Sequence, residues 1–326
     1  MNREILLNMG KAIDLIKESS NIFIASHINP DGDNIGSSLA LALALKKINK
    51  NIVVLKSDII PIDFTFLPGI NLIKEYDDKL DDIDLFITLD CGDINRLGQN
   101  KILFENAKKT INIDHHISNT NFGDINIVDS KVTATGELIY YFIKQMEIEI
   151  DKDIATNIYT AISTDTGSFK YESVSSDTHR IIADLLDIGI DKSDININLY
   201  ENMSFTRMKL FIKSLTTLET FNNGKIAVIE VTQEMLKETG ASLEDSEGIV
   251  SFIKKLSTVE AACILKELEK EDIKISLRTK KYLDASYICN KFDGGGHKRA
   301  AGCTIYKGIK EAKELIVKSI QEAMKV

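Results

Sequence analysis

The chain has 326 residues, of which 44% are hydrophobic and 27% are charged, and its formal net charge at pH 7 is −9. This length predicts about two domains, because single hydrophobic cores rarely grow beyond roughly 250–300 residues. The negative charge argues against binding to long duplex nucleic acid, which depends on many lysine and arginine contacts to phosphate. The longest apolar stretch among the first 50 residues, 39–45, is far shorter than the roughly 20 residues that span a bilayer. We therefore expect a cytoplasmic protein that does not use a membrane.

Apolar runs alternate with helical patterns in the first half of the chain. The run at 21–25 leads into a polar segment, and Asn34 is expected to cap a helix that continues to about residue 48. Apolar strands that alternate with helices form a parallel sheet covered on both faces, and ligands bind at the carboxyl ends of its strands. Further strands are expected at 52–55, 85–89 and 110–113, and further helices at 133–146, 154–162 and 178–188.

The apolar pattern weakens after residue 190 and then recovers. We expect a first domain at 1–190, a linker at 191–214 and a second domain at 215–326. The predicted fold class is α/β, with a larger parallel-sheet domain, a smaller mixed-sheet domain and the active site in the cleft between them. In the second domain, strands are expected at 225–231, 259–265 and 273–277, and helices near 246–256 and 309–324.

Imidazole and carboxylate side chains gather at the predicted strand ends of the first domain. His27, Asp31 and Asp33 lie within seven residues, although a solvated polar loop is an equal alternative. Asp90 follows the apolar run at 85–89, where a carboxylate could equally cap a turn. Such side chains together hold divalent metal ions, and metal ions promote the hydrolysis of phosphate esters.

The next strand end carries a stronger signal. Asp114, His115 and His116 follow the apolar run at 110–113, and two adjacent histidines beside a carboxylate have little structural use. Exposed loop histidines are the alternative explanation. Asp165 lies at the end of a predicted helix, where its structural role would be to end that helix.

A glycine-rich segment near the C-terminus suggests phosphate binding. Successive glycines let the backbone approach an anion closely, and their N–H groups can surround a phosphate. Arginine adds planar, bidentate contacts that lysine cannot copy. An ordinary glycine turn is the alternative, but the basic residues that follow argue against it. The candidate phosphate-binding residues are Arg278, Gly294, Gly295, Gly296, His297 and Arg299.

In order and spacing, these motifs resemble those of the DHH phosphoesterase superfamily, which includes RecJ-type nucleases and family II pyrophosphatases. The resemblance extends through the second domain, where ISLRTK at 275–280 and FDGGGHKRAAG at 292–302 resemble the DHH-associated domain with its GGGH signature. The chain is most similar to the oligoribonuclease A type, the nanoRNase and pAp phosphatase branch. One departure is Asp293, which stands where many relatives carry a fourth glycine and could alter substrate preference.

The resemblance implies a site with two metal ions. Mn2+ is the expected metal, with Mg2+ or Co2+ as alternatives, and a hydroxide between the two ions would attack the phosphate. Asp114 would orient a histidine, and His116 would contact the scissile phosphate or protonate the leaving oxygen. The first ion would be held by His27, Asp31 and Asp90, and the second by Asp33, Asp90, His115 and Asp165.

The resemblance also implies an activity. We expect hydrolysis of oligoribonucleotides of a few nucleotides, as an exonuclease, and of 3′-phosphoadenosine 5′-phosphate (pAp) to AMP and phosphate. One alternative is a phosphodiesterase for cyclic di-AMP or linear pApA, and another is a nucleotide-binding regulator with a catalytically silent metal site. The expected partners are short RNA or small nucleotides, and a homodimer is an open alternative.

Overall fold

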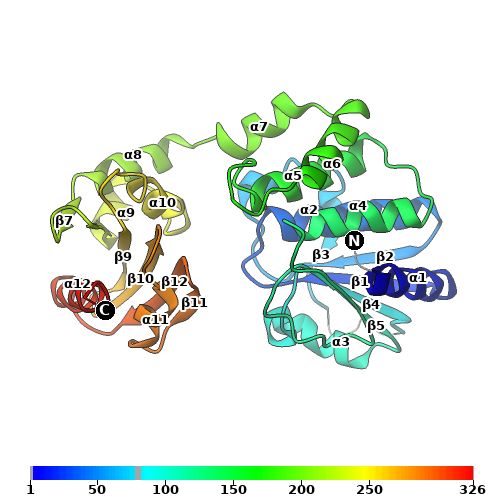
Figure 1. Cartoon of the computed structure of the whole chain (residues 1–326), viewed down its shortest axis with the longest axis horizontal. Helices are drawn as coiled ribbons and strands as arrows, with labels where there is room; N and C mark the ends of the chain where they lie inside the picture. Colours follow the sequence, from blue (N-terminus) through cyan, green and yellow to red (C-terminus); the bar gives the residue numbers. More distant parts are fainter. Residues whose placement is uncertain (1–2, 78–81, 326) are drawn as a thin grey trace. The chain divides into compact units, whose positions relative to one another are not determined.

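The computed structural model describes residues 3–77 and 82–325. The chain divides into two compact units between Asn202 and Met203 (Figure 1). Among the described residues, no helix combines the length and the apolar character that crossing a membrane requires.

The first unit is built on a six-stranded sheet in the order β3-β2-β1-β4-β5-β6. All of its paired strands are parallel, and every residue of β4 and β5 is buried, as expected for a sheet with both faces covered. The strand order reverses between β1 and β4, which is where α/β sheets of this kind bind ligands. The strands are β1 (Asn21–Ser26), β2 (Asn51–Leu55), β3 (Ile73–Lys74), β4 (Leu85–Leu89), β5 (Thr110–Asp114) and β6 (Ile125–Val128).

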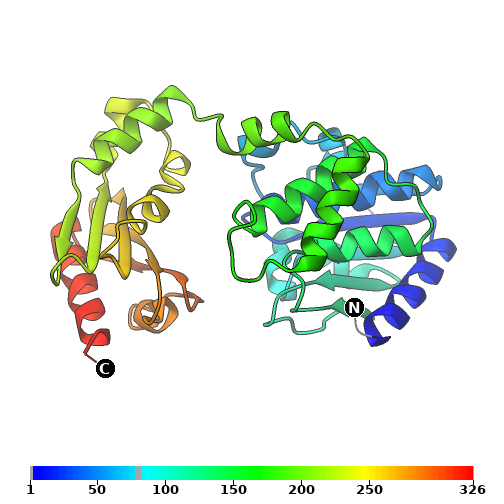
Figure 2. The same cartoon turned by 45° about the horizontal axis from the view of Figure 1, so that its top comes forward.

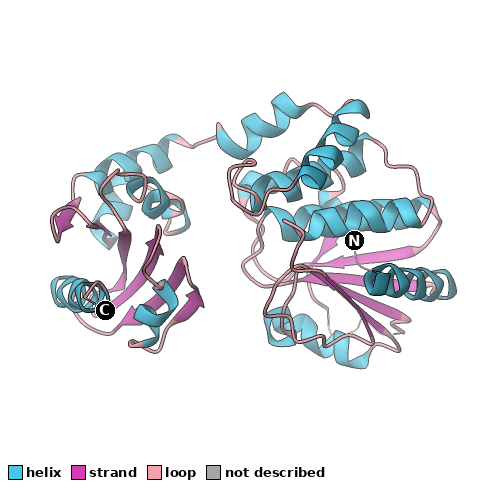
Figure 3. Ribbon diagram, viewed as in Figure 1, coloured by secondary structure: helices cyan, strands magenta, loops and turns pink. Residues whose placement is uncertain are grey.

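Helices pack on both faces of this sheet (Figures 1 and 3). Alternate side chains of β1 show the division: Ile22 and Ile24 join the core formed with α1, α2, α4 and α5, whereas Phe23 and Ala25 join the core on the α3 side. Helix α1 lies next to β6 and α4 (Figure 2). The helices are α1 (Arg3–Glu18), α2 (Gly32–Lys47), α3 (Lys101–Asn106), α4 (Thr135–Gln145), α5 (Lys152–Asp165), α6 (Ser176–Asp187) and α7 (Lys192–Tyr200).

The start of α2 differs from the sequence prediction. Asn34 is not the N-cap: the helix begins at Gly32, and the Asp31 side chain accepts a hydrogen bond from the Asn34 backbone N–H. Asn34 is buried, and its side chain bonds Ser26 and the carbonyl of His27. Helix α5 packs closely against the first residue of α2, Gly32. Glycine is needed at this position because a Cβ there would lie 2.3 Å from the Thr164 hydroxyl. This packing brings the start of α2 beside the end of α5.

The second unit contains a mixed sheet in the order β11-β12-β10-β9-β8-β7, as predicted for the smaller domain. Only β8 and β9 pair in parallel among its described strands. Helices α8, α9 and α10 cover one face, and α11 and α12 the other. The elements are β7 (Glu219–Phe221), β8 (Ile226–Val231), β9 (Ala261–Glu269), β10 (Asp272–Thr279), β11 (Gly295–His297), β12 (Ala300–Ile305), α8 (Phe205–Leu215), α9 (Gln233–Thr239), α10 (Ile249–Ile253), α11 (Ala285–Asn290) and α12 (Ile309–Ala323).

The segment expected to act as a linker, 191–214, contains α7 and most of α8. The two units separate between these helices. Helix α7 buries only Ile195 among its residues, so its sequence lacks the apolar stripe that would have predicted it.

Candidate active site

The histidines and aspartates of the first unit meet at the carboxyl ends of β1, β4 and β5. His27, Asp90 and His115 directly follow these three strands, and Asp165 is the last residue of α5. Within each of three overlapping groups, the potential ligand atoms lie within 4.8 Å of one another. The groups are His27 with Asp31 and Asp90, Asp33 with His115 and Asp165, and Asp90 with His115 and His116.

Asp90 is at the centre of the cluster and is 2% exposed. One of its oxygens lies 3.3 Å from His27 Nε2, and the other lies 3.6 Å from His115 Nε2. Its backbone has φ = 54°, a left-handed conformation that is costly for a residue with a side chain and is found most often at functional sites. The two oxygens therefore face different histidines, as a carboxylate shared between two ions requires.

Asp33 is fixed by the first turn of α4. Its oxygens accept hydrogen bonds from the backbone N–H groups of Thr135, at 2.6 Å, and Gly136, at 2.9 Å, and from the Ser37 hydroxyl. Asp33 thus takes the place of an N-cap acceptor for α4, whose own N-cap position is held by Ala134. The Thr135 hydroxyl donates to Asp90 Oδ1 at 3.0 Å. A single residue, Thr135, therefore holds two candidate ligands.

His27 is oriented by its own backbone neighbour. Its Nδ1 lies 2.7 Å from the carbonyl oxygen of Ile28, so we assign the ring proton to Nδ1. Its Nε2 then carries the lone pair and faces Asp90, with an Asp31 oxygen 3.9 Å away. A histidine with one nitrogen bonded to a carbonyl and the other turned to carboxylates has the arrangement of a metal ligand.

The electrostatics of the cluster also fit a bound cation. Burial raises the pKa of Asp33 well above its ordinary value and raises that of Asp165 to about 6. Burial would also raise the pKa of Asp90, but the imidazoles of His27 and His115 beside it hold it well below its ordinary value. Divalent cations would offset the cost of holding these carboxylates ionised in a buried site. Imidazole nitrogen and carboxylate oxygen suit Mn2+, Mg2+ or Co2+.

His116 has a different neighbourhood from His115. Its Nδ1 lies 2.7 Å from Asp114 Oδ1, and this hydrogen bond raises the pKa of His116 to about 9. Asp114 is fully buried, and its other oxygen accepts a 2.6 Å hydrogen bond from the Asn119 side chain. The chain Asn119–Asp114–His116 leaves His116 Nε2 for another partner. Asn119 and Thr135 carry no signal in the sequence, because neither residue type is a typical metal ligand or acid.

Adding Mn2+ is expected to stabilise the first unit against unfolding. An ion at 100 times its dissociation constant should contribute about 2.7 kcal/mol, because it binds the folded cluster and not the unfolded chain. Differential scanning calorimetry with and without Mn2+, after treatment with a chelator, measures the shift. In Asp33→Asn the shift should shrink, and an equal shift in that variant would contradict the assignment of Asp33 as a ligand.

The predicted phosphate-binding residues of the second unit lie around β10, β11 and β12. Strand register pairs Ala300 with Arg278 on one side and with His297 on the other. Directly paired residues in antiparallel strands project from the same face, so Arg278 and His297 flank the small side chain of Ala300 on one face of the sheet. This is the face opposite the core that contains α11 and α12.

Arg299 and the glycines have structural roles as well. The Arg299 guanidinium donates to the carbonyl oxygens of Leu283, at 2.8 Å, and Lys281, so two of its nitrogens hold the chain after β10. Gly295 and Gly296 belong to the short strand β11, which the sequence did not predict. A Cβ on Gly294 would lie 2.4 Å from the Cβ of Cys303. Close packing therefore requires at least Gly294, whatever its role in binding.

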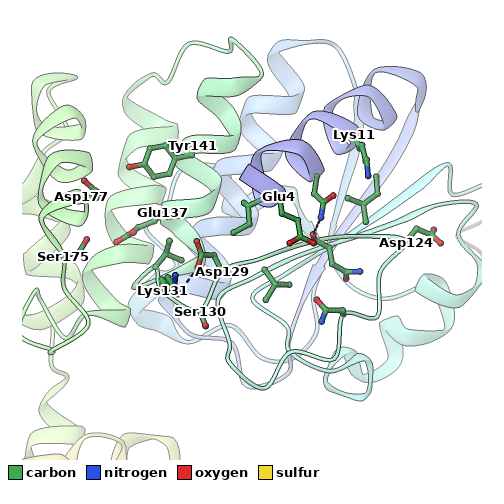
Figure 4. Close-up of a pocket in the computed structure, with 17 residues that line it drawn as sticks. Glu4, Lys11, Asp124, Asp129, Ser130, Lys131, Glu137, Tyr141, Ser175 and Asp177 are labelled. Atoms are coloured by element: carbon green, nitrogen blue, oxygen red, sulfur yellow. Dashed lines mark hydrogen bonds between the residues drawn. The ribbon is translucent and has the colours of Figure 1, made fainter. Parts of the chain in front are cut away.

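Two other features lie away from these sites. A cavity of about 920 Å3 is lined by α1, β6, α4 and the start of α6 (Figure 4). Glu137 lies in its wall and accepts hydrogen bonds from Thr133 and Thr178, while the predicted site residues lie elsewhere.

His179, the remaining histidine, is exposed and has its ring centroid 6.0 Å from that of Phe169.

Comparisons with known proteins identify a family for each of the two units. Residues 21–162 match the DHH family, N-terminal domain, and residues 223–326 match the DHHA1 domain. The bifunctional oligoribonuclease and PAP phosphatase NrnA of Thermus thermophilus is 31% identical over 306 residues, which cover 93% of this chain and 90% of that protein. The probable bifunctional oligoribonuclease and PAP phosphatase NrnA of Streptococcus mutans is 27% identical over 291 residues, covering 89% of this chain and 91% of that one.

A solved structure shares the whole fold. The crystal structure of an exopolyphosphatase-related protein from Bacteroides fragilis superposes with a TM-score of 0.92 at 30% identity, covering 97% of this chain and 96% of that chain. The chain therefore belongs to the DHH family of phosphoesterases and carries a C-terminal DHHA1 domain.

Proposed function

We propose that the protein is a metal-dependent phosphoesterase that hydrolyses short oligoribonucleotides and converts pAp to AMP and phosphate. The broader assignment, a hydrolase that acts on phosphate esters, follows from its family and from the named relatives. The observation that carries metal-dependent hydrolysis is the cluster around Asp90, in which two buried carboxylates and two histidines converge. The chain matches relatives named as oligoribonuclease and PAP phosphatase along nearly their full length, and this match supports the proposed substrate class.

In this proposal the chain holds and orients the groups that react. Two divalent cations, Mn2+ in our proposal, would polarise the phosphate and lower the pKa of water when bound. His27, Asp31 and Asp90 would hold one of them, and Asp33, Asp90, His115 and Asp165 the other. The hydrogen bonds from Thr135 keep the oxygens of Asp33 and Asp90 in place before substrate arrives. Such fixed ligands avoid reorganisation during the reaction.

His116 is the proposed proton donor to the leaving oxygen. The hydrogen bond with Asp114 raises the pKa of its imidazole, so the ring is protonated near neutral pH. With Nδ1 engaged by Asp114, the proton available for transfer is the one on Nε2. Asn119, which bonds the other oxygen of Asp114, keeps that carboxylate turned toward His116.

The DHHA1 domain is the proposed binding domain for the rest of the substrate. Arg278 offers a guanidinium on the same sheet face as His297. Lys254 lies near this arginine: burial lowers the pKa of Lys254, and the positive charges of Arg278 and Lys280 lower it further. Three clustered cations suit a phosphate of a short substrate, whereas the overall charge of −9 opposes long polyanions.

A substrate panel tests the proposal. We expect turnover of pAp, of pApA and of di- to pentaribonucleotides by the intact chain with Mn2+, and loss of turnover after chelation. A phosphodiesterase for cyclic dinucleotides, the main alternative, would instead hydrolyse cyclic di-AMP faster than pAp, since the two enzymes share the metal site and differ in what the second domain accepts. Binding of these nucleotides without turnover of any of them would favour a regulator with a silent site.

A further inference from the structure

A second cavity, of about 750 Å3, lies in the DHHA1 domain beside the glycine-rich segment. Gly302 on β12 pairs with Ser276 on β10 and with Gly295 on β11, so the three form one row across the sheet. All three residues line the cavity. Because their side chains are small or absent, this row leaves space for a ligand beside the glycine-rich segment. The volume is that of a site for a small molecule.

The wall of this cavity is basic. Lys274, Lys291 and Lys307 line it. Lys291 and Lys307 pair with carboxylates on α12 at 3.5 and 3.2 Å, and exposed pairs of this kind are weak enough for a stronger anion to compete. Within the described part of the chain, Lys274 makes no ion pair. Three lysines around a cavity suit a phosphorylated ligand.

Two further side chains of the cavity are suited to binding a nucleobase. Tyr306 lines it and is 75% exposed, so its ring is free to stack on a base. Asp293 is the one carboxylate among the lining residues. Its φ of 54° suits the left-handed turn before β11, which glycine, asparagine and aspartate adopt most easily. Within residues 82–325, the Asp293 carboxylate has no hydrogen bond or ion pair, so its oxygens are available to a ligand.

We propose that this cavity binds one nucleotide of the substrate and that Asp293 makes it selective for guanine. This inference rests on the proposed function, because it concerns a nucleotide substrate. Guanine presents two adjacent donors, N1–H and the N2 amino group, which can bond the two oxygens of one carboxylate. Adenine and cytosine place an acceptor nitrogen beside their amino group, and uracil places its one N–H between two carbonyls, so a carboxylate meets repulsion at each of them.

Direct binding to the intact chain tests the proposal. Isothermal titration calorimetry with GMP, IMP and AMP should show GMP binding about tenfold more tightly than AMP, since hydrogen bonds to a charged group are among the stronger ones. IMP keeps N1–H and lacks the N2 amino group, so its affinity should lie between the two. Both Asp293→Asn and Asp293→Gly should bring the affinities for GMP and AMP close together.

The ratio of affinities is the decisive quantity. Removing a negative charge near lysines can tighten the binding of any nucleotide. Glu311→Gln, at the carboxylate that pairs with Lys307 at 3.2 Å, controls for this effect and should keep the ratio. Equal affinity of the unaltered chain for GMP and AMP, a preference that survives in Asp293→Gly, or no binding of GMP would overturn the inference. The proposed function is tested separately, by turnover in the substrate panel.

Discussion

Replacing Asp90 with asparagine should lower kcat for pAp by about a thousandfold or more, the equivalent of about 4 kcal/mol in transition-state stabilisation. The two oxygens of Asp90 face His27 and His115 from the middle of the cluster, so no neighbouring carboxylate can replace both contacts. The asparagine amide offers one neutral oxygen and an NH2 group, whose two N–H bonds point positive charge at a cation and repel it. Steady-state kinetics at saturating Mn2+ and metal analysis of the purified variant, which should hold less metal than the unaltered chain, measure the effect.

Asp84→Asn provides a matched control at the opposite end of the same strand. Asp84 precedes β4, where its carboxylate accepts hydrogen bonds from the backbone N–H groups of Ser20 and Asn21 and pairs with Lys108 at 2.8 Å. The same substitution there removes a charge without touching the cluster, so activity should be retained. A fully active Asp90→Asn enzyme, with circular dichroism unchanged, would refute the assignment of Asp90 as the shared ligand.

The strands that carry the site could be predicted from sequence because each is a continuous apolar run that ends in a polar residue. β4 and β5 are buried along their whole length, and Asp90 and Asp114 lie at their carboxyl ends. Strand β12, with the sequence AAGCTI, escaped prediction because its small residues make a weak apolar signal. Helix α7 escaped for the related reason that it buries a single residue, Ile195.

The candidate ligands could be predicted as residue types, but their supports could not. Thr135 lies 102 positions from Asp33 in the chain and yet donates its backbone N–H to that carboxylate. A contact of this range depends on how α2, α4 and the sheet pack, and a local sequence pattern does not contain that information. The error at Asn34 has a similar origin: Asp31 and Asn34 are both good capping residues, and the close packing of α2 on α5 places the helix start at Gly32.

Asp33 links the stability of the fold to the site. The carboxylate that caps α4 is also a candidate metal ligand, so the first turn of α4 and the cluster cannot move independently. Glu137, in the same turn, accepts hydrogen bonds from Thr133 and from Thr178 on α6. The turn 135–137 thus connects α2, α6 and the candidate ligands.

His116→Ala should lower kcat for pAp by about 10^2- to 10^4-fold, the usual contribution of a positioned general acid. The loss should depend on the leaving group. The ribose oxygen that leaves from pAp or from an oligoribonucleotide needs a proton as the P–O bond breaks, whereas p-nitrophenolate leaves readily without one. Turnover of a p-nitrophenyl phosphodiester with Mn2+ should therefore fall much less in the variant than turnover of pAp, and comparing kcat for the two substrates measures the difference.

A role in binding phosphate would give a different pattern. If His116 only contacted the phosphate, both substrates would lose similar activity, and the change would appear mainly in KM. His179→Ala is the control, because His179 is exposed on α6 and contacts Phe169 rather than the cluster, so its loss should leave both substrates unaffected. An equal loss of kcat for pAp and for the p-nitrophenyl ester in His116→Ala would show that this residue does not protonate the leaving oxygen.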